Sequence, residues 1–265
     1  MIRRPVPPPA RAALGAGCAL AVVLGYSVLS WQAHRENPDN TTVPNAAQLW
    51  AGVTELVTPN RAGDVALVED AAATARRFAL GMAAGVGLSF LVGVAMGCLT
   101  PVGAALGPTL LFFGAVPPTA MLAIYYRVFG TGELLYVGLI ALGVFPLLAG
   151  GLYKSVLTDV TDHAVFKAYT LGASDAEVVW NVVVPQTLPR FVEGVRLAAG
   201  LGMIFLIAAE WLLAGEGFGH TLRLRSNKAA MDEVYPYLFL LGAFGLAVDY
   251  GLLRLRRWLA PWWRG

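Results

Sequence analysis

The sequence predicts an all-α, polytopic membrane protein with six transmembrane helices. Of its 265 residues, 57% are hydrophobic and only 14% are charged, and its mean hydropathy is +0.62. Soluble domains average about 45–50% apolar and about 25% charged residues, so this composition excludes a cytosolic enzyme, a coiled coil and a disordered chain. Six apolar stretches are each long enough to cross a bilayer core, which needs about 20 residues in a helix.

The apolar stretches alternate with polar segments along the chain. The first follows Arg3, Arg4 and Arg11 and has no small-residue cleavage site, so we interpret it as a retained span rather than a signal peptide. The predicted spans are Ala12–Trp31, Phe78–Leu99, Leu106–Val128, Leu134–Tyr153, Val195–Ala214 and Tyr235–Leu255.

The charges between the spans predict the orientation. With the N-terminus in the cytosol, most of the 19 Lys and Arg residues lie on the inner side, as the positive-inside rule requires. The Trp and Arg residues after position 255 suit the inner headgroup layer, so both termini are expected in the cytosol. The resulting segments are a tail with the first span (1–31), an outer loop (32–77), a five-helix core (78–258) with a cytosolic loop (154–194), and an interfacial tail (259–265).

The outer loop contains an amphipathic stretch, Ala46–Val57. Asn45 follows Pro44 and is a favourable N-cap for a short helix there. We expect this helix to lie on the outer membrane surface or against neighbouring spans.

The cytosolic loop is patterned as two helices joined at a glycine. Asp162 can cap a first helix that ends at Leu171, and Gly172 suits the left-handed position after a helix. Ser174 begins a Ser-Asp-Ala-Glu capping box, which starts a second helix. We expect that second helix to end at Pro185, because proline cannot continue the hydrogen-bond ladder.

The first helix of this elbow presents apolar side chains to the cytosol. It could lie on lipid as an amphipathic hairpin, or it could dock into a groove of a soluble partner. The apolar side chains are those of Ala164, Val165, Ala168, Tyr169 and Leu171.

The third span is predicted to break at Pro117 and Pro118, which remove backbone donors near its centre. Irregular backbone at membrane depth is tolerated where it is buried in protein or lines a water-filled cavity. The break is therefore either a packing kink or part of a translocation pathway. The candidate pathway or gate residues are Pro117, Pro118, Met121, Tyr125 and Glu210.

Charges inside the spans need partners. Glu210 lies near the outer end of the fifth span, where an unpaired carboxylate is costly, so we expect a gate or an inter-helix pair. Asp249 is expected to pair with Arg254 one turn away, and Arg196 can snorkel. The pairs Gly81/Gly85, Gly93/Gly97 and Gly103/Gly107 have the spacing that permits close helix packing, or dimerisation of the second span.

The cytosolic elbow resembles a loop of a known family. The run Ala168–Ser174, followed at matching spacing by Val182, Val184 and Pro185, resembles the loop of permease subunits from bacterial ATP-binding-cassette importers. The similarity extends to the nitrate, sulfonate, taurine and bicarbonate branch over residues 40–258. Its further matches are Thr42–Asn45, Pro117–Pro118, Phe129–Glu133, Leu188–Pro189, Gly194–Ala198, Ala208–Glu210 and Gly245–Asp249.

This resemblance implies a type I importer core in a bacterial inner membrane. Two copies would form the pore, as a homodimer rather than a heterodimer. An extracytoplasmic solute-binding protein would deliver a small anion to this pore, which would move it into the cytosol. Two ATPase subunits, which hold ATP and Mg²⁺, would dock on the elbow. The residues implied in this coupling are Asp162, Val165, Phe166, Lys167, Ala168, Tyr169, Leu171, Gly172, Ala173, Ser174, Val182, Val184 and Pro185.

Two features qualify the resemblance. Phe166 and Lys167 stand where the family loop has Glu and its first Ala, which affects how the loop would contact the ATPase. The chain has no Gly-x-x-x-x-Gly-Lys-[Ser/Thr] motif, so it is not expected to hydrolyse ATP or to bind a cofactor itself.

Other functional classes predict features that the sequence lacks. A secondary transporter would need an inverted repeat and buried ionisable relays. An intramembrane enzyme would need a nucleophile and base, or a metal site, at one depth, whereas His34, His163 and His220 lie far apart in the sequence. The net charge of +2 gives no reason to expect nucleic-acid binding.

Overall fold

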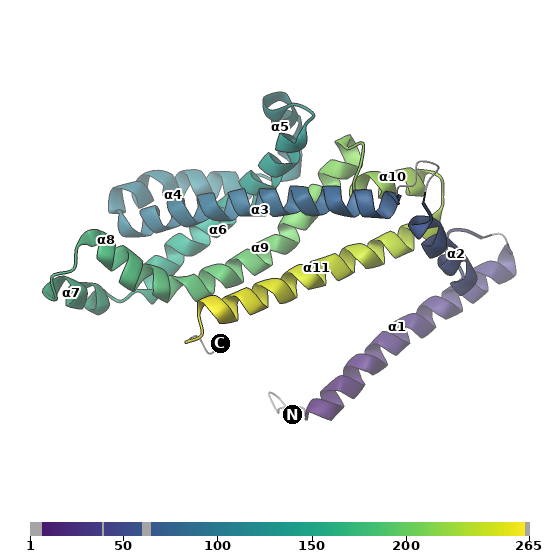
Figure 1. The fold of residues 1–265 in the computed structure, drawn as a ribbon, viewed down its shortest axis with the longest axis horizontal. Helices are drawn as coiled ribbons and strands as arrows, with labels where there is room; N and C mark the ends of the chain where they lie inside the picture. The colour runs from purple at the N-terminus through teal and green to yellow at the C-terminus, as the bar shows by residue number, and fades with distance from the viewer. Residues whose placement is uncertain (1–6, 39, 60–64, 263–265) are drawn as a thin grey trace. The chain divides into compact units, whose positions relative to one another are not determined.

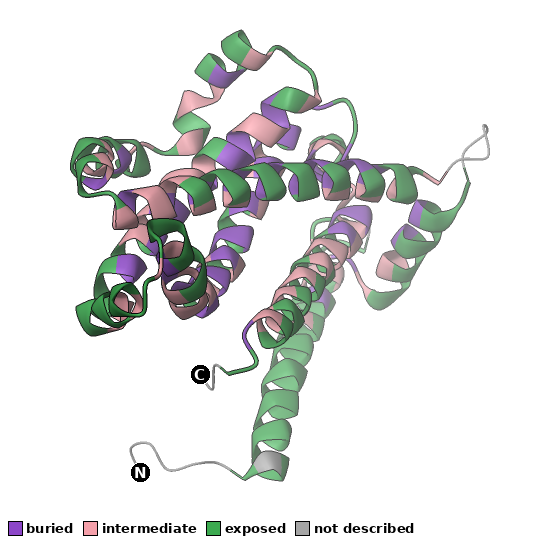
Figure 2. Ribbon diagram, turned by 60° about the vertical axis from the view of Figure 1, so that its left-hand side comes forward, coloured by how far each residue is buried: buried purple, intermediate pink, exposed green. Residues whose placement is uncertain are grey.

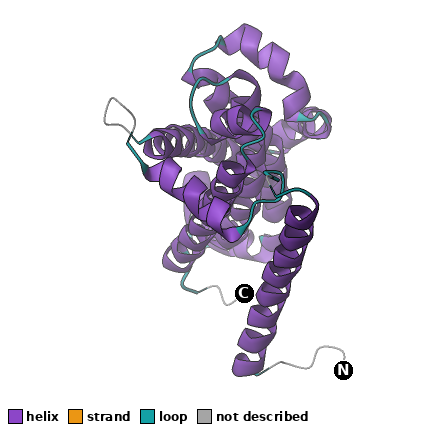
Figure 3. Ribbon diagram, turned by 90° about the vertical axis from the view of Figure 1, so that its right-hand side faces the viewer, coloured by secondary structure: helices purple, strands orange, loops and turns teal. Residues whose placement is uncertain are grey.

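The computed structural model describes residues 7–38, 40–59 and 65–262, and among these it contains helices and no strands (Figures 1 and 3). Five described helices are long and apolar enough to span a membrane, or six if a bent pair counts as one span. This confirms the predicted all-α, polytopic fold. The chain divides into two compact units, Met1–Ala66 with Leu224–Leu238, and Leu67–Arg223 with Phe239–Gly265.

The first unit contains the long helix α1 (Pro8–Glu36) and the short helix α2 (Ala46–Val57). The predicted bounds and cap of α2 are confirmed, because Asn45 and Gln48 form a capping box. Tyr26 of α1 donates a hydrogen bond to the carbonyl of Pro44 at 2.7 Å, which fixes the approach to α2. Within this unit α2 also packs against the residues that open the last helix, since a Cβ at Gly52 would collide with the backbone of Asp232.

Helix α1 is exposed along most of its length (Figure 2). Its apolar side chains, among them Leu14, Val22 and Leu29, are more than half exposed. Apolar exposure on this scale suits lipid contact rather than water. Arg3 and Arg4 lie outside the described residues.

The second unit is built around three long helices, α3 (Ala66–Cys98), α6 (Glu133–Asp159) and α9 (Val184–Leu213). Its core is fully buried at Leu139, Val144 and Leu206. These side chains come from α6 and α9, and α3 adds Phe78 and Met82 to the same core.

Glycines on α3 explain how closely it packs on α6. A Cβ added at Gly81, Gly85, Gly93 or Gly97 would lie 2.5–2.9 Å from a side chain of α6, tighter than real contacts. The small-residue spacing therefore serves close packing within one chain. Their partners on α6 are Ile140, Val144, Leu152 and Val156.

The predicted third span is broken, as expected. Helix α4 (Thr100–Ala115) is followed by the short 3₁₀ helix η1 (Pro118–Met121) and by α5 (Leu122–Phe129), with a bend of 88° between the two halves. Val116 is extended, which is the conformation that a following proline favours.

The elbow comprises α7 (Asp162–Thr170), α8 (Asp175–Val178) and the π-helical segment η2 (Val179–Val183). The predicted end at Pro185 is wrong, because α9 starts at Val184 and continues to Leu213. The proline falls in the first turn of α9, where a missing N–H costs least, and the wider π turn before it shifts the hydrogen-bond register.

Helices α10 (Phe218–Asn227) and α11 (Met231–Leu259) complete the chain. The expected pair of Asp249 with Arg254 is wrong, because Asp249 binds Arg196 of α9 through two hydrogen bonds. Arg196 therefore does not simply snorkel. It also reaches Glu193 at 3.0 Å, and this carboxylate accepts a second bond from Arg256 at 2.8 Å.

Candidate functional site

The turn of the elbow is fixed by two local devices, both predicted from the sequence. Gly172 has φ +87°, the left-handed conformation that a side chain would strain. Ser174 accepts a hydrogen bond from the N–H of Glu177, whose side chain bonds back to the N–H of Ser174. Both devices act between residues close in sequence, so the conformation of the turn does not depend on distant residues.

The start of α7 differs by one residue from the prediction. Thr161 occupies the N-cap, but its side chain makes no capping hydrogen bond. Asp162 is the first helical residue. Asp162 still lies in the first turn, where a carboxylate interacts favourably with the helix dipole. The helix ends at Thr170, with Leu171 as its C-cap.

The exposed apolar face at α7 and its C-cap consists of Phe166, Tyr169 and Leu171, which are 65%, 43% and 80% exposed. Ala164, Val165 and Ala168, expected on this face, are half-buried instead. Phe166, which stands where the family loop has Glu, is therefore part of this face. Tyr169 donates a hydrogen bond to Asp175 at 2.9 Å, and this bond raises the pKa of the phenol, which stays protonated at neutral pH.

The remaining candidate residues of the elbow lie at the end of α7, in the turn after it, and where η2 meets α9. Lys167 and Ala173 complete the α7 turn, and the backbone N–H of Ala173 donates to Ala168 at 3.1 Å. Val182, Val184 and Pro185 are half-buried where η2 meets α9. Arg190 of α9 forms an ion pair with Asp159 at the end of α6 at 2.7 Å, which ties the two helices together beside the elbow.

The break between α4 and α5 borders a cavity of about 840 Å³. It is lined by residues of α3, α4, η1, α5, α6 and α9. Three of the predicted pathway residues, Pro118, Met121 and Tyr125, line it. The structure places Pro117 at the N-cap of η1, next to this wall, and Glu210 in a separate polar network.

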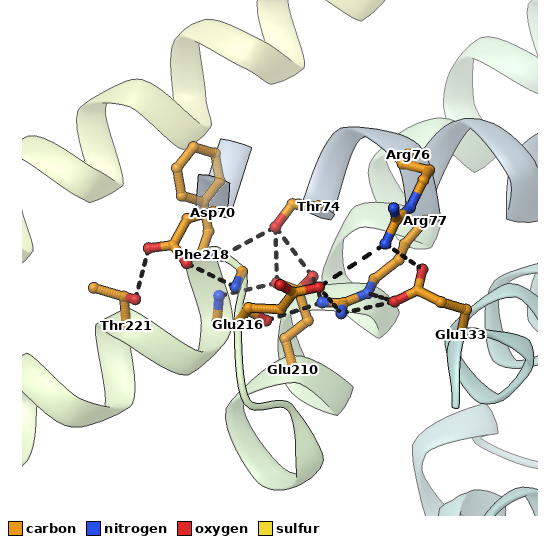
Figure 4. A network of polar contacts seen from close by, with 11 residues as sticks. Asp70, Thr74, Arg76, Arg77, Glu133, Glu210, Glu216, Phe218 and Thr221 are labelled. Atoms are coloured by element: carbon orange, nitrogen blue, oxygen red, sulfur yellow. Dashed lines mark hydrogen bonds and ion pairs between the residues drawn. The ribbon is translucent and has the colours of Figure 1, made fainter. Parts of the chain in front are cut away.

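That network lies at the opposite end of α6 and α9 from the elbow and is centred on Arg77 of α3 (Figure 4). Arg77 is 3% exposed and Glu210 is 0% exposed. The Arg77 guanidinium donates at 2.9 Å to the carboxylates of Glu210 and Glu133, and at 3.0 Å to Glu216. Its charged end also lies 4.4 Å from the ring centre of Tyr136.

The second half of the network ties the start of α10 to α3. Thr74 donates to the Glu210 carboxylate at 3.0 Å and accepts from the N–H of Phe218 at 3.0 Å. Asp70 accepts from the N–H of Gly217 at 2.8 Å and from the hydroxyl of Thr221 at 2.6 Å (Figure 4).

The glycine-rich stretch at the start of α10, residues 215–219, donates its backbone N–H groups to the chain's own carboxylates. Gly219 donates its N–H to Glu210 at 3.0 Å, and Gly217 donates to Asp70. Backbone N–H groups of this kind bind phosphates in nucleotide loops. Here both are used internally, so this stretch has an architectural role.

Sequence reasoning found Glu210 but missed Arg77, Asp70 and Thr74. Arg77 was assigned to the outer loop because the predicted span began at Phe78, whereas α3 begins at Ala66. The one available signal was an unpaired Glu210 near a span end, which required a cation somewhere in the chain.

Residues 85–265 match the protein family described as "Binding-protein-dependent transport system inner membrane component". The chain is 31% identical over 220 residues to the taurine transport system permease protein TauC of Escherichia coli, covering 83% of this chain and 80% of that protein. It is 28% identical over 191 residues to the formylaminopyrimidine transport permease protein ThiX of Halalkalibacterium halodurans, covering 72% and 76%. It is 26% identical over 190 residues to the nitrate import permease protein NrtB of Synechococcus elongatus, covering 70% and 67%.

Proposed function

The chain belongs to the family of binding-protein-dependent transport system inner-membrane components, and from this premise we propose what it carries and how it is driven. It is the permease subunit of an ATP-binding-cassette importer, a multi-pass protein of the inner membrane. The family works with ATPase and solute-binding partners. In this proposal the elbow binds the ATPase partner, and the break in the third span forms part of the solute pathway.

The exposed face of Phe166, Tyr169 and Leu171 is the observation that carries the first assignment. Large apolar side chains at the solvated end of a compact helix are stabilised when a groove covers them. The turn that presents them is rigid, because Gly172 and the capping box fix it locally. We assign this face to an ATPase subunit, with both chain termini on the same, cytosolic side.

The partners, rather than this chain, hold ATP and Mg²⁺ in this proposal. When the ATPases close on ATP, they would displace the elbow. This displacement would be transmitted directly to α9, because α8, η2 and α9 follow one another without a loop. The ion pair of Arg190 with Asp159 would carry it to α6 as well. A second, identical copy of the chain would complete the pore, with one ATPase under each copy.

The solute is proposed to be a small anion. Relatives named for aliphatic sulfonates and nitrate support this class. The solute-binding protein would deliver it from outside, and the cavity beside Pro118, Met121 and Tyr125 would receive it.

The assignment of the elbow is tested by isolating the tagged protein from native membranes in mild detergent and measuring ATPase activity in the isolated material. Leu171→Asp places a charge on the most exposed apolar position of the elbow and should remove the ATPase. Trp50→Asp on α2 is the matched control, because Trp50 is also an exposed apolar residue, at 71%, but lies outside the elbow.

The expected result is ATPase activity with the wild type and with Trp50→Asp, and its loss with Leu171→Asp. Retention of the ATPase by Leu171→Asp and by a second variant, Phe166→Asp, would show that the partner binds elsewhere. Absence of any ATPase from the wild type would overturn the assignment altogether.

A further inference from the structure

The cavity at the break in the third span is apolar on nearly every side. None of the described residues that line it carries a charge, and its walls include Leu110, Phe113, Phe145 and Phe205. Its volume of about 840 Å³ falls within the about 300–1,000 Å³ of small-molecule sites, which share this apolar character. An inorganic anion would gain nothing from such walls and would lose hydration on entering.

One buried hydroxyl in this wall lacks a strong partner. Tyr125 is 7% exposed, and its hydroxyl is bonded to the sulfur of Met121 at 3.9 Å. A thioether sulfur is a weak acceptor, and buried hydroxyls generally find an oxygen or nitrogen. Because Tyr125 and Met121 both line the cavity, this hydroxyl is available to an oxygen of a bound molecule.

The cavity also has an open side. Leu111, which lines it, is 77% exposed, so the cavity opens through this face of α4 and is not closed on all sides. An amphipathic ligand can therefore enter from this side and lie with its body against the apolar walls.

We propose that each permease subunit holds the solute in this cavity during transit and that the cavity selects organic anions with an apolar body, such as alkyl- or arylsulfonates, over nitrate. The apolar walls accept the body, and the Tyr125 hydroxyl donates a hydrogen bond to an oxygen of the head. This inference rests on the proposed function and adds a specificity that belongs to the permease rather than to the solute-binding protein. Tyr125 is the residue that binds the head of the solute.

The test measures equilibrium binding of radiolabelled alkylsulfonates to the wild-type complex of permease and ATPase in lipid nanodiscs, without the solute-binding protein. Affinity should rise roughly fourfold for each methylene from propane- to hexanesulfonate, the increment expected for a buried methylene. Nitrate should not displace hexanesulfonate. Tyr125→Phe, which keeps the ring, should weaken hexanesulfonate binding about tenfold, because a hydrogen bond to a charged oxygen is lost.

A pair of glycine variants tests the location. Gly114 lines the cavity, and a Cβ there would contact Pro146 at an ordinary 3.5 Å, so Gly114→Leu should fill the space and abolish hexanesulfonate binding. Gly151→Leu on α6 is the control, since Gly151 is exposed, faces open space and does not line the cavity. It should bind hexanesulfonate as the wild type does.

Several results would overturn the inference. One is the absence of saturable hexanesulfonate binding in a complex that still hydrolyses ATP, which would leave the proposed function intact. Equal displacement by nitrate, or equal loss in Gly151→Leu, would also overturn it. If Gly114→Leu instead dissociates the permease dimer while each copy still binds hexanesulfonate, the cavity is a contact between copies.

Discussion

Two regions lie at opposite ends of helices α6 and α9: the elbow of α7 and α8, and the polar network around Arg77. They differ in burial, in polarity and in the sequence separation of the residues that interact. The elbow is exposed, apolar and held by bonds between residues close in sequence. The network is buried and charged, and it joins residues as far apart as Asp70 and Gly217. Helix α6 separates them by about 40 Å, the length of 27 residues in a helix.

This difference shows which end is complete within the chain. Nearly every oxygen and N–H of the network has a partner inside the same unit, so the network needs nothing from outside and makes its end of the bundle rigid. The elbow leaves Phe166 and Leu171 uncovered, and we propose that the ATPase covers them. The rigid end suits a fixed support, and the incomplete end suits a moving partner.

The largest loss of stability is expected from Arg77→Gln. Removing this cation leaves Glu210 buried without its charge partner, which costs about 3–5 kcal/mol of unfolding free energy. Thermal unfolding of the purified permease in mild detergent would measure the loss.

Arg76→Gln is the matched control for this variant. Arg76 is adjacent in sequence and pairs with Glu133 at 3.2 Å, but its side chain is 57% exposed. Exposed pairs contribute about 0–1 kcal/mol, so this variant should unfold close to the wild type. Equal losses from the two variants would mean that burial does not distinguish the two arginines.

A comparison of two glycines sharpens the contrast between the regions. Gly217, with φ +107°, lies in the network, and a Cβ there would approach the Glu210 carboxylate to 2.5 Å. Gly172, with φ +87°, lies in the elbow and has open space around it. Alanine should therefore cost about 2–4 kcal/mol at Gly217, from strain and crowding, and about 1–2 kcal/mol at Gly172, from strain alone.

Thermal unfolding of both alanine variants would measure these costs, and asparagine provides a control. Asn tolerates the left-handed conformation, so Gly172→Asn should recover part of the loss, whereas Gly217→Asn should not. A Gly172→Ala variant that is less stable than Gly217→Ala would contradict the view that the elbow stands free of the rest of the unit.

The sequence predicted the elbow better than the network because the signals of the elbow are local. A capping box and a left-handed glycine act within a few residues, and the Pro117–Pro118 break is equally local. The end of the second helix at Pro185 was predicted wrongly because a π turn, which has no clear sequence signature, carries the chain past the proline.

The network could not be predicted residue by residue. Its central pair, Arg77 and Glu210, is separated by 133 residues, and the partner of each charge depends on how three helices pack. The same holds for Asp249, which has Arg254 one turn away but binds Arg196 across to α9. The sequence indicates that a charge in a span needs a partner, and only the packed fold decides which one.

A smaller effect is expected from Ser174→Ala at the start of α8. This change removes the capping box and should cost about 1 kcal/mol, the usual loss of an N-cap. Ser174→Thr keeps a capping hydroxyl and should restore most of the stability. Amide hydrogen exchange would detect the loss at residues 175–178 before it is visible in global unfolding, and unchanged exchange there would argue against the cap as the device that fixes the turn.

The smallest effect on stability, and the sharpest separation of the two regions, is expected from Phe166→Asp. Phe166 is 65% exposed, so the change should alter the unfolding free energy by less than about 0.5 kcal/mol. The same change should release the ATPase from the isolated complex, because it places a charge in the face that we assign to the ATPase. Arg77→Gln should show the reverse pattern, with a lower unfolding temperature and an ATPase that stays bound wherever the chain is folded. If Phe166→Asp instead destabilises the isolated permease as much as Arg77→Gln does, the face of the elbow packs against its own chain, and the contrast between a complete end and an incomplete end fails.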